Sequence, residues 1–232
     1  MTQRRFYEQW NLKIGRDKLA DVLRENGLLI VKNGRKVFTT YSKHRFYKYP
    51  NIVKEFVLTA PNQVWVSDIT YVLTWNGFVY LSMITDAYSR KIVGWAVHKT
   101  LATEGCLKAL KKALDALPNS AKGLIHHSDR GVQYCSNAYV EQLNKRKIGI
   151  SMTHNGDPYE NALAERMNRT IKEEMLDNQA FRNIQEAQAK IEKAVNNYNQ
   201  IRPHWALNLE TPNKIHKNEQ KKVLKISQPI SG

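Results

Sequence analysis

The stretch VWVSDITYVLTWNGFVYLSMITD, residues 64–86, decides the fold class of this chain. Two runs rich in β-branched and aromatic residues flank the pair Asn76–Gly77. An Asn-Gly pair between two such runs is the strongest short-range signal for a β-hairpin. A third run of this type, KIVGWAV at residues 91–97, follows after the turn residues AYSR. The sequence therefore predicts a three-strand antiparallel meander.

Beyond this meander, helical and strand-like patterns alternate along the chain. Leu107, Leu110 and Leu114 share one side of an expected helix, which Pro118 ends. Short strand-like runs then alternate with helical ones, and the order predicts an α/β fold with helices packed on a mixed sheet. The expected strands cover residues 123–129 and 149–153, and the expected helices cover residues 103–117, 137–148, 156–174 and 184–201.

Composition excludes several classes of protein. Of the 232 residues, 42% are hydrophobic, which is enough for a core and argues against global disorder. The sequence has no long apolar run suited to a membrane span and no apolar core of a signal peptide near its start. Cys106 and Cys135 lie far apart without metal-type spacing, so we expect packed thiols in a reducing cytosol.

The charge of the chain points to a polyanionic partner. Lys and Arg total 36 against 21 Asp and Glu, which gives a net charge of +15. Residues 1–61 hold 13 Lys or Arg and 5 Asp or Glu, residues 62–201 hold 17 and 14, and residues 202–232 hold 6 and 2. Nucleic acid is the usual partner of such a chain, although a ribosomal or generally basic protein has the same composition. We therefore predict a basic N-terminal DNA-binding region at 1–61 and a basic tail at 202–232. The segment between them, 62–201, has a different role, which the resemblance described below identifies as a catalytic core.

The N-terminal region combines a short helix with a basic and aromatic segment. The pattern RDKLADVLRENGLL predicts an amphipathic helix that ends near Gly27. The segment that follows, residues 31–50, interleaves cations with Phe and Tyr, which suits phosphate neutralisation and stacking on bases. The alternative is a solvated loop whose aromatic residues cover the next domain.

A second informative stretch, GDPYENALAERMNRTIKEE at residues 156–174, concentrates five carboxylates. Asp157, Pro158 and Glu160 form the capping pattern of a helix N-terminus, so we expect a structural role for both acids. On a helical wheel, an apolar stripe faces the core and Glu165 lies opposite to it. The stripe consists of Leu163, Met167 and Ile171, with Glu174 in line.

The face of this helix that bears Glu165 also carries amides and cations. Asn161, Asn168, Arg169 and Lys172 share it, and Lys172 lies two turns beyond Glu165. Such a face could bind a metal at one end and a phosphate at the other. The alternative is a solvated face with helical ion pairs, and Glu173 and Glu174 are interpreted as surface charge.

Two further carboxylates are candidates for the same site. Asp68 lies inside a strand, where a carboxylate is costly unless it is paired or binds a metal, and Asp129 ends a short buried strand. If these strands are neighbours, the two carboxylates converge at the carboxyl ends of the strands, and Glu165 adds a third. Oxygen ligands of this type suit Mg²⁺ or Mn²⁺, and a pair of such ions serves phosphodiester chemistry.

Other polar residues are assigned structural roles. Asp86 ends the second strand just before a turn, where Asp commonly bonds the backbone. His126 and His127 precede Asp129, and we expect one to face the core and the other to lie near the site without binding metal directly.

The acidic residues also resemble a known family. Thirty-five residues separate Asp129 from Glu165, and 60 separate Asp68 from Asp129. This spacing resembles the Asp-Asp-Glu (DDE) recombinases, which include insertion-sequence transposases and retroviral integrases. Four longer segments are similar to bacterial insertion-sequence transposases, and the resemblance extends over about residues 15–213. They are WVSDITY at 65–71, HHSDRGVQYCS at 126–136, the stretch at 156–174 and YNQIRPHWALNLETP at 198–212.

The resemblance implies a ribonuclease H-like mixed sheet with helices on both faces, beside the short helical and basic N-terminal region. It implies a polynucleotidyl transferase in which Asp68, Asp129 and Glu165 bind two Mg²⁺ or Mn²⁺ ions. Water would nick DNA at the ends of the element, and the exposed 3′-hydroxyl would join target DNA by transesterification without a covalent enzyme intermediate. Lys172 occupies a position thought to contact terminal DNA in this family. The candidate DNA contacts are Lys36, Lys43, Arg45, Lys48, Arg130, Arg169 and Lys172.

The resemblance also sets expectations about partners and location. Only a short remnant precedes Gly15, whereas family members usually have a longer N-terminal region, and a separate upstream frame often encodes a helix-turn-helix. We therefore expect the second reading frame alone or a truncated copy, which acts as an oligomer on DNA in the bacterial cytoplasm, at the nucleoid and away from membranes. A metal-dependent nuclease without strand transfer and a non-catalytic repressor derived from a transposase are the alternatives.

Overall fold

The computed structural model describes residues 11, 13–26, 44–119, 121–154 and 161–217. The chain divides into two compact units, Met1–Arg35 and Lys36–Gly232. In the first unit, helix α2 (Arg16–Glu25) confirms the predicted N-terminal helix and buries Leu19. The expected cap at Gly27, the Asp157–Glu160 capping pattern, and Lys36 and Lys43 lie outside the described residues. Within the described part of the chain, no helix is both long and apolar enough to cross a membrane.

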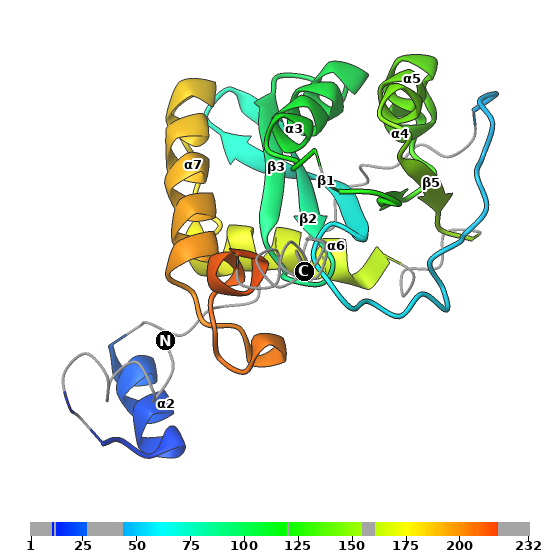
Figure 1. The fold of residues 1–232 in the computed structure, drawn as a ribbon. Helices are drawn as coiled ribbons and strands as arrows, with labels where there is room; N and C mark the ends of the chain where they lie inside the picture. The colour runs from blue at the N-terminus through cyan, green and yellow to red at the C-terminus, as the bar shows by residue number, and fades with distance from the viewer. Residues whose placement is uncertain (1–10, 12, 27–43, 120, 155–160, 218–232) are drawn as a thin grey trace, which may run out of the picture. The chain divides into compact units, whose positions relative to one another are not determined.

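The second unit contains a five-stranded mixed sheet with the strand order β3-β2-β1-β4-β5 (Figure 1). The predicted meander is confirmed, because β1 pairs antiparallel with β2 and β2 pairs antiparallel with β3. Gly77 has a φ of +106°, a conformation that glycine adopts without steric cost at the hairpin turn. Strand β4 pairs parallel with β1 and with β5. The strands are β1 (Val64–Thr74), β2 (Gly77–Asp86), β3 (Ile92–His98), β4 (Ile125–Ser128) and β5 (Gly149–Met152).

Helices cover both faces of this sheet, as the family resemblance implied (Figure 1). One face packs against α3 (Thr103–Asp115), α4 (Val132–Cys135) and α5 (Asn137–Lys145). The other face packs against α6 (Ala162–Arg169), the π-helical segment η2 (Thr170–Met175) and α7 (Ile184–Gln200).

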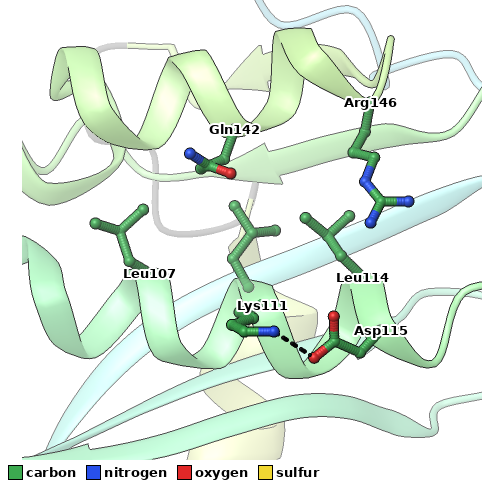
Figure 2. A pocket seen from close by; sticks show the side chains of 7 residues that line it. Leu107, Lys111, Leu114, Asp115, Gln142 and Arg146 are labelled. Carbon is green, nitrogen blue, oxygen red and sulfur yellow. Dashed lines mark hydrogen bonds and ion pairs between the residues drawn. The ribbon is translucent and has the colours of Figure 1, made fainter.

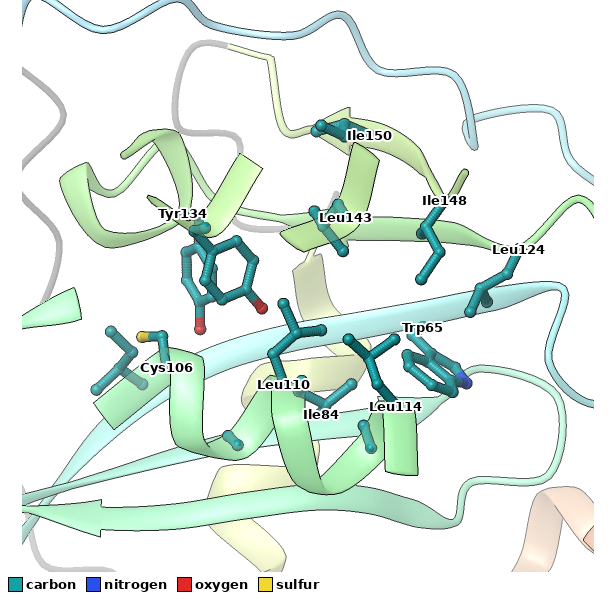
Figure 3. Close-up of a cluster of buried hydrophobic side chains, with 14 of the residues drawn as sticks. Trp65, Ile84, Cys106, Leu110, Leu114, Leu124, Tyr134, Leu143, Ile148 and Ile150 are labelled. Atoms are coloured by element: carbon teal, nitrogen blue, oxygen red, sulfur yellow. The ribbon is translucent and has the colours of Figure 1, made fainter. Parts of the chain in front are cut away.

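Successive side chains of β1 point to opposite faces of the sheet. Trp65 and Ile69 belong to the cluster under α3 and α5, where Trp65 lies close to Leu110 and Leu114 (Figure 3). Val72 belongs to the opposite cluster, with α6 and α7. Asp68 has the same parity as Val72, so β1 directs it toward α6.

The helix after β5 departs from the regular wheel that the sequence predicts. From Thr170 the helix becomes π-helical, with Leu176 N–H donating to the Ile171 carbonyl at 3.0 Å. The wider turn shifts the phase of the side chains. Leu176 therefore follows Ile171 into the core, whereas Glu174 turns outward and pairs with Arg202 at 2.7 Å. The interpretation of Glu174 as surface charge is thus confirmed, and the apolar stripe is continued by Leu176.

The C-terminal segment contacts the core where it is described. A short 3₁₀ helix, η3 (Trp205–Leu207), is followed by a helical stretch over residues 212–217. In that stretch, the buried His216 lies with Nδ1 at 2.8 Å from Ser89 Oγ, in the turn between β2 and β3. The part of the predicted basic tail up to residue 217 is therefore attached to the sheet.

Candidate active site

Asp68 lies within β1, one residue beyond its parallel pairing with β4, and Asp129 directly follows β4. The β1–β4 ladder ends at the pair Ser67 and Ser128, and each aspartate is the next residue of its chain segment. The adjacency that the sequence analysis required is confirmed. Asp129 thus lies at the carboxyl end of β4, a common location for sites in α/β folds, and Asp68 lies beside it on β1.

Asp68 is partly buried, and the pKa of its carboxyl group is raised. Its Oδ1 accepts from the Ile69 N–H at 2.8 Å, and its Oδ2 accepts from Asn168 Nδ2 at 2.7 Å. Burial, together with the negative charges of Asp129 and Glu165, raises the pKa of Asp68 to about 7, despite the opposing hydrogen bonds. A buried carboxylate beside another acid is a place where a cation would be strongly favoured.

Asp129 is held by the turn that follows β4. Its Oδ1 accepts from the Gly131 N–H at 2.9 Å, and its backbone carbonyl accepts from Ser128 Oγ at 3.0 Å. A side chain at position 131 would crowd this arrangement, because a Cβ there would lie 2.9 Å from Asp129 Oδ1. The turn therefore fixes the direction of the carboxylate by backbone contacts.

Glu165 projects from α6 on the same side of the sheet, but its side chain is exposed. Its charge acts on Asp68, which places it in electrostatic range of the two aspartates. Among the residues that the structure describes, no three His, Cys, Asp or Glu side chains lie close enough to bind one ion together. The structure thus brings Asp68 and Asp129 together and leaves Glu165 beside them.

Asn161 and Asn168 correct the interpretation of the helix face. They were expected on a polar face with Glu165, yet both are buried against β1. Asn161 Nδ2 donates to the Ser67 carbonyl at 3.1 Å, and Asn168 Nδ2 donates to Asp68. Their Oδ1 atoms are buried, and within the described chain neither has a hydrogen-bond partner. The sequence signal for this role was the spacing of Asn161 and Asn168, which lie four residues before and three residues after Glu165.

The donor set of the site fits a hard divalent cation. Carboxylate and amide oxygens are the preferred ligands of Mg²⁺ and Mn²⁺. The pKa of Asp68 is raised because its carboxyl group is shielded from water and lies near other negative charges. A bound cation would relieve that repulsion, and the carboxylates of Asp68 and Asp129 could hold it.

The structure describes five of the cations predicted to contact DNA. Lys172 Nζ lies 3.8 Å from the centroid of the Tyr71 ring, and burial lowers the pKa of Lys172. Arg169 is exposed on α6, and Arg130 is half-buried next to Asp129. Arg45 and Lys48 are exposed in the segment before β1.

The other polar candidates have structural partners. Asp86 is fully buried; its oxygens accept from the Asn62 N–H at 2.6 Å and from the Ser89 N–H and Oγ at 2.7 Å each. This confirms its assignment to the turn. His126 bonds Ser67 Oγ at 2.7 Å and Tyr139 OH at 2.9 Å, and burial lowers the pKa of His126 to about 3.

His127 is also buried, with Nδ1 at 2.9 Å from Ser151 Oγ. Both cysteines are buried free thiols, as expected. Burial raises the pKa of Cys106 to about 12 and that of Cys135 to about 11, so neither is a reactive thiolate at neutral pH.

A separate pocket lies between α3 and α5 (Figure 2). Its leucine floor comes from α3, and the rim carries the Lys111–Asp115 ion pair at 2.9 Å together with Gln142 and Arg146. None of the candidate site residues lines it. The lining residues are Leu107, Leu110, Lys111, Leu114, Asp115, Gln142 and Arg146.

Comparison with protein-family models gives two matches. Residues 59–158 match a model described as Integrase core domain, and residues 146–212 match a second model with the same description. Together the two matches extend over β1 to β5 and the helices that carry the candidate site.

Curated relatives agree with these models. The chain is 37% identical to the transposase for insertion sequence element IS629 of Shigella sonnei, over 82% of this chain and 64% of that protein. It is 32% identical to the transposase for IS904 of Lactococcus lactis, over 88% of each chain. The chain thus spans just under two thirds of the length of the first of these relatives.

Solved structures share the fold. The catalytic core domain of HTLV-2 integrase, determined in complex with magnesium, superposes with a TM-score of 0.53 over 68% of this chain and 97% of that one. A chain from the structure of a simian T-cell lymphotropic virus intasome gives a TM-score of 0.57 over 84% of this chain and 63% of that one. The sequence identities are 23% and 16%, so this likeness concerns the fold alone.

Proposed function

Because this chain belongs to the insertion-sequence transposases with an integrase core domain, we propose that it cleaves DNA at element ends and joins them to target DNA. The reaction is metal-dependent transesterification, with a 3′-hydroxyl as the nucleophile of the joining step. The observation that carries this proposal is the pair Asp68 and Asp129, each one residue beyond the last pair of the parallel β1–β4 ladder. Their mutual repulsion in a partly buried position favours a cation.

The proposal assigns a role to each of these residues. Asp68 and Asp129 bind the divalent ions, Mg²⁺ or Mn²⁺, and the exposed Glu165 completes the ligand set when its helix and the DNA come together. Two ions bound there would stabilise both the attacking and the leaving oxygen of the phosphodiester. Asn168 holds Asp68 through the 2.7 Å hydrogen bond and so limits the directions that the carboxylate can take.

The surrounding cations suit the DNA substrate. Lys172, which lies on the Tyr71 ring, presents a positive charge on the same helical unit as Glu165. Arg169, Arg130, Arg45 and Lys48 extend positive charge away from the carboxylates, where phosphates on either side of the reacting bond would lie. We expect these contacts to position DNA without reading its sequence.

A strand-transfer assay tests the proposal. Purified protein is incubated with Mg²⁺ and a labelled duplex that ends in the inverted repeat of the element, and joined products are counted. Asp68→Asn and Asp129→Asn should each abolish cleavage and joining while binding to the same duplex persists. Asp115→Asn, which removes an exposed acid of α3, is the matched control and should leave the reaction unchanged. Joining by either of the first two variants would exclude that residue from the site. Cleavage without joining in the wild-type protein would identify a nuclease instead.

A further inference from the structure

The chain segment before β1 lies across the ends of β4 and β5. The Pro50 carbonyl accepts from the Met152 N–H at 3.3 Å, and the Ile52 N–H donates to Ser151 Oγ at 3.0 Å. Phe46 and Tyr49 pack against the hydrophobic cluster under α3 and α5. The segment is therefore fixed relative to the turn that carries Asp129.

At the start of this segment, His44 contacts the Asp129 turn directly. Its Nε2 lies 2.9 Å from the Arg130 carbonyl oxygen. A carbonyl only accepts hydrogen bonds, so Nε2 carries the proton and donates. The ring also lies against Phe46, with centroids 5.7 Å apart. His44 is thus held both by packing and by one specific hydrogen bond.

A single peptide group connects His44 to the Asp129 carboxylate. The Arg130 carbonyl, which accepts from His44, and the Gly131 N–H, which donates to Asp129 Oδ1 at 2.9 Å, belong to the same peptide unit. Because the peptide unit is planar, the orientation of its carbonyl also sets the direction of its N–H. Donation from His44 further polarises the peptide and strengthens the bond on its other side.

We propose that His44 is a positioning residue for Asp129, acting through the Arg130–Gly131 peptide group. This inference rests on the proposed role of Asp129 as a metal ligand. Loss of the His44 donor lets the peptide rotate, so that the carboxylate samples more orientations and binds a divalent ion more weakly. Groups that orient metal ligands typically contribute 10- to 100-fold to metal affinity.

Calorimetric titration with MgCl₂, without DNA, measures this effect. His44→Phe keeps a ring against Phe46 but removes the donor, and it should raise the half-saturating Mg²⁺ concentration about tenfold. His44→Gln retains an N–H that can reach the carbonyl and should restore affinity close to that of the wild type. His98→Phe is the matched control, because His98 Nδ1 makes a similar bond to the Thr100 carbonyl at 3.1 Å in an exposed turn. It should not change Mg²⁺ affinity.

Amide hydrogen exchange at Gly131, followed by NMR without metal, separates this inference from the proposed function. His44→Phe should accelerate exchange of that amide, whereas His44→Gln and His98→Phe should not. If Asp129→Asn leaves Mg²⁺ binding unchanged, the proposed metal site fails. If Asp129→Asn abolishes binding while His44→Phe matches the wild type in both Mg²⁺ affinity and Gly131 exchange, the positioning role alone is overturned. Should His44→Phe fold poorly, His44→Ala removes the same donor, and wild-type Mg²⁺ affinity together with wild-type Gly131 exchange in that variant would also overturn the positioning role.

Discussion

Replacing Asp68 by Asn should stabilise the protein when no divalent ion is present. Burial and the charge of Asp129 raise the pKa of Asp68 from 3.8 to about 7, so the ionised side chain opposes folding above that pH. Below pH 3.8 the carboxyl is protonated in both states and contributes no penalty. As pH rises toward 7, the unfolded chain loses its proton first, and the folded state becomes relatively less stable. Above pH 7 the penalty is constant.

The magnitude follows from the size of the shift. A displacement from 3.8 to about 7 corresponds to an upper limit of about 4 kcal/mol for ionised Asp68. Asn would keep one of the bonds from Ile69 and Asn168 and turn its NH₂ toward the other donor, which costs about 1–2 kcal/mol. The net gain at pH 8 is therefore about 2 kcal/mol, equivalent to a rise in Tm of about 4–8 °C for a domain of this size. At pH 4 the variant should have no advantage.

Thermal unfolding in EDTA between pH 4 and pH 8 measures this gain, with Asp115→Asn as the control for loss of an exposed acid. Excess MgCl₂ at pH 8 should then reverse the order, because the wild-type site binds the ion and the variant does not. The reasoning is refuted if Asp68→Asn is less stable than the wild type at pH 8 without metal. It is also refuted if the gain is the same at every pH.

Three further substitutions test the fold and the DNA surface. Gly94→Ala should lower the free energy of unfolding by about 1–3 kcal/mol, measured by urea titration, because the new Cβ would collide with the backbone of α3; full stability would show that the strand and helix separate easily. Asp86→Asn should cost about 1–3 kcal/mol in the same assay, since its NH₂ would face donors such as the Ser89 N–H, and an unchanged midpoint would contradict the turn assignment. Lys172→Ala should weaken binding to the element-end duplex and reduce its dependence on salt, whereas Lys112→Ala, which removes a lysine lying 3.6 Å from the Trp95 ring, should not; equal effects of the two would argue against a phosphate contact by Lys172.

Local sequence signals predicted much of the fold. The Asn76–Gly77 pair between β-type runs located the hairpin, because turn chemistry is encoded in adjacent residues. The sequence also predicted that Asp68 and Asp129 lie close together, on one condition. It required only that their strands be neighbours, which the parallel β1–β4 ladder confirms.

Features that depend on tertiary packing were not predictable. The π-helical segment that turns Glu174 toward Arg202 changes the phase of a helix whose sequence has a regular apolar stripe. The burial of Asn168 against Asp68 depends on how α6 meets the sheet, which helical periodicity alone does not specify. The contact of His216 with Ser89 joins residues 127 positions apart, and no local pattern marks it.

We propose that Asp68, Asp129 and Glu165 act together on DNA with a divalent ion, and Glu165 is the member that the structure leaves exposed. The most direct measurement is therefore strand transfer by Glu165→Gln, compared with the wild type across a MgCl₂ titration on the element-end duplex. We predict Mg²⁺-dependent joined products from the wild type and none from Glu165→Gln at any Mg²⁺ concentration, with duplex binding retained by both. Joining by Glu165→Gln at the wild-type rate would contradict the account.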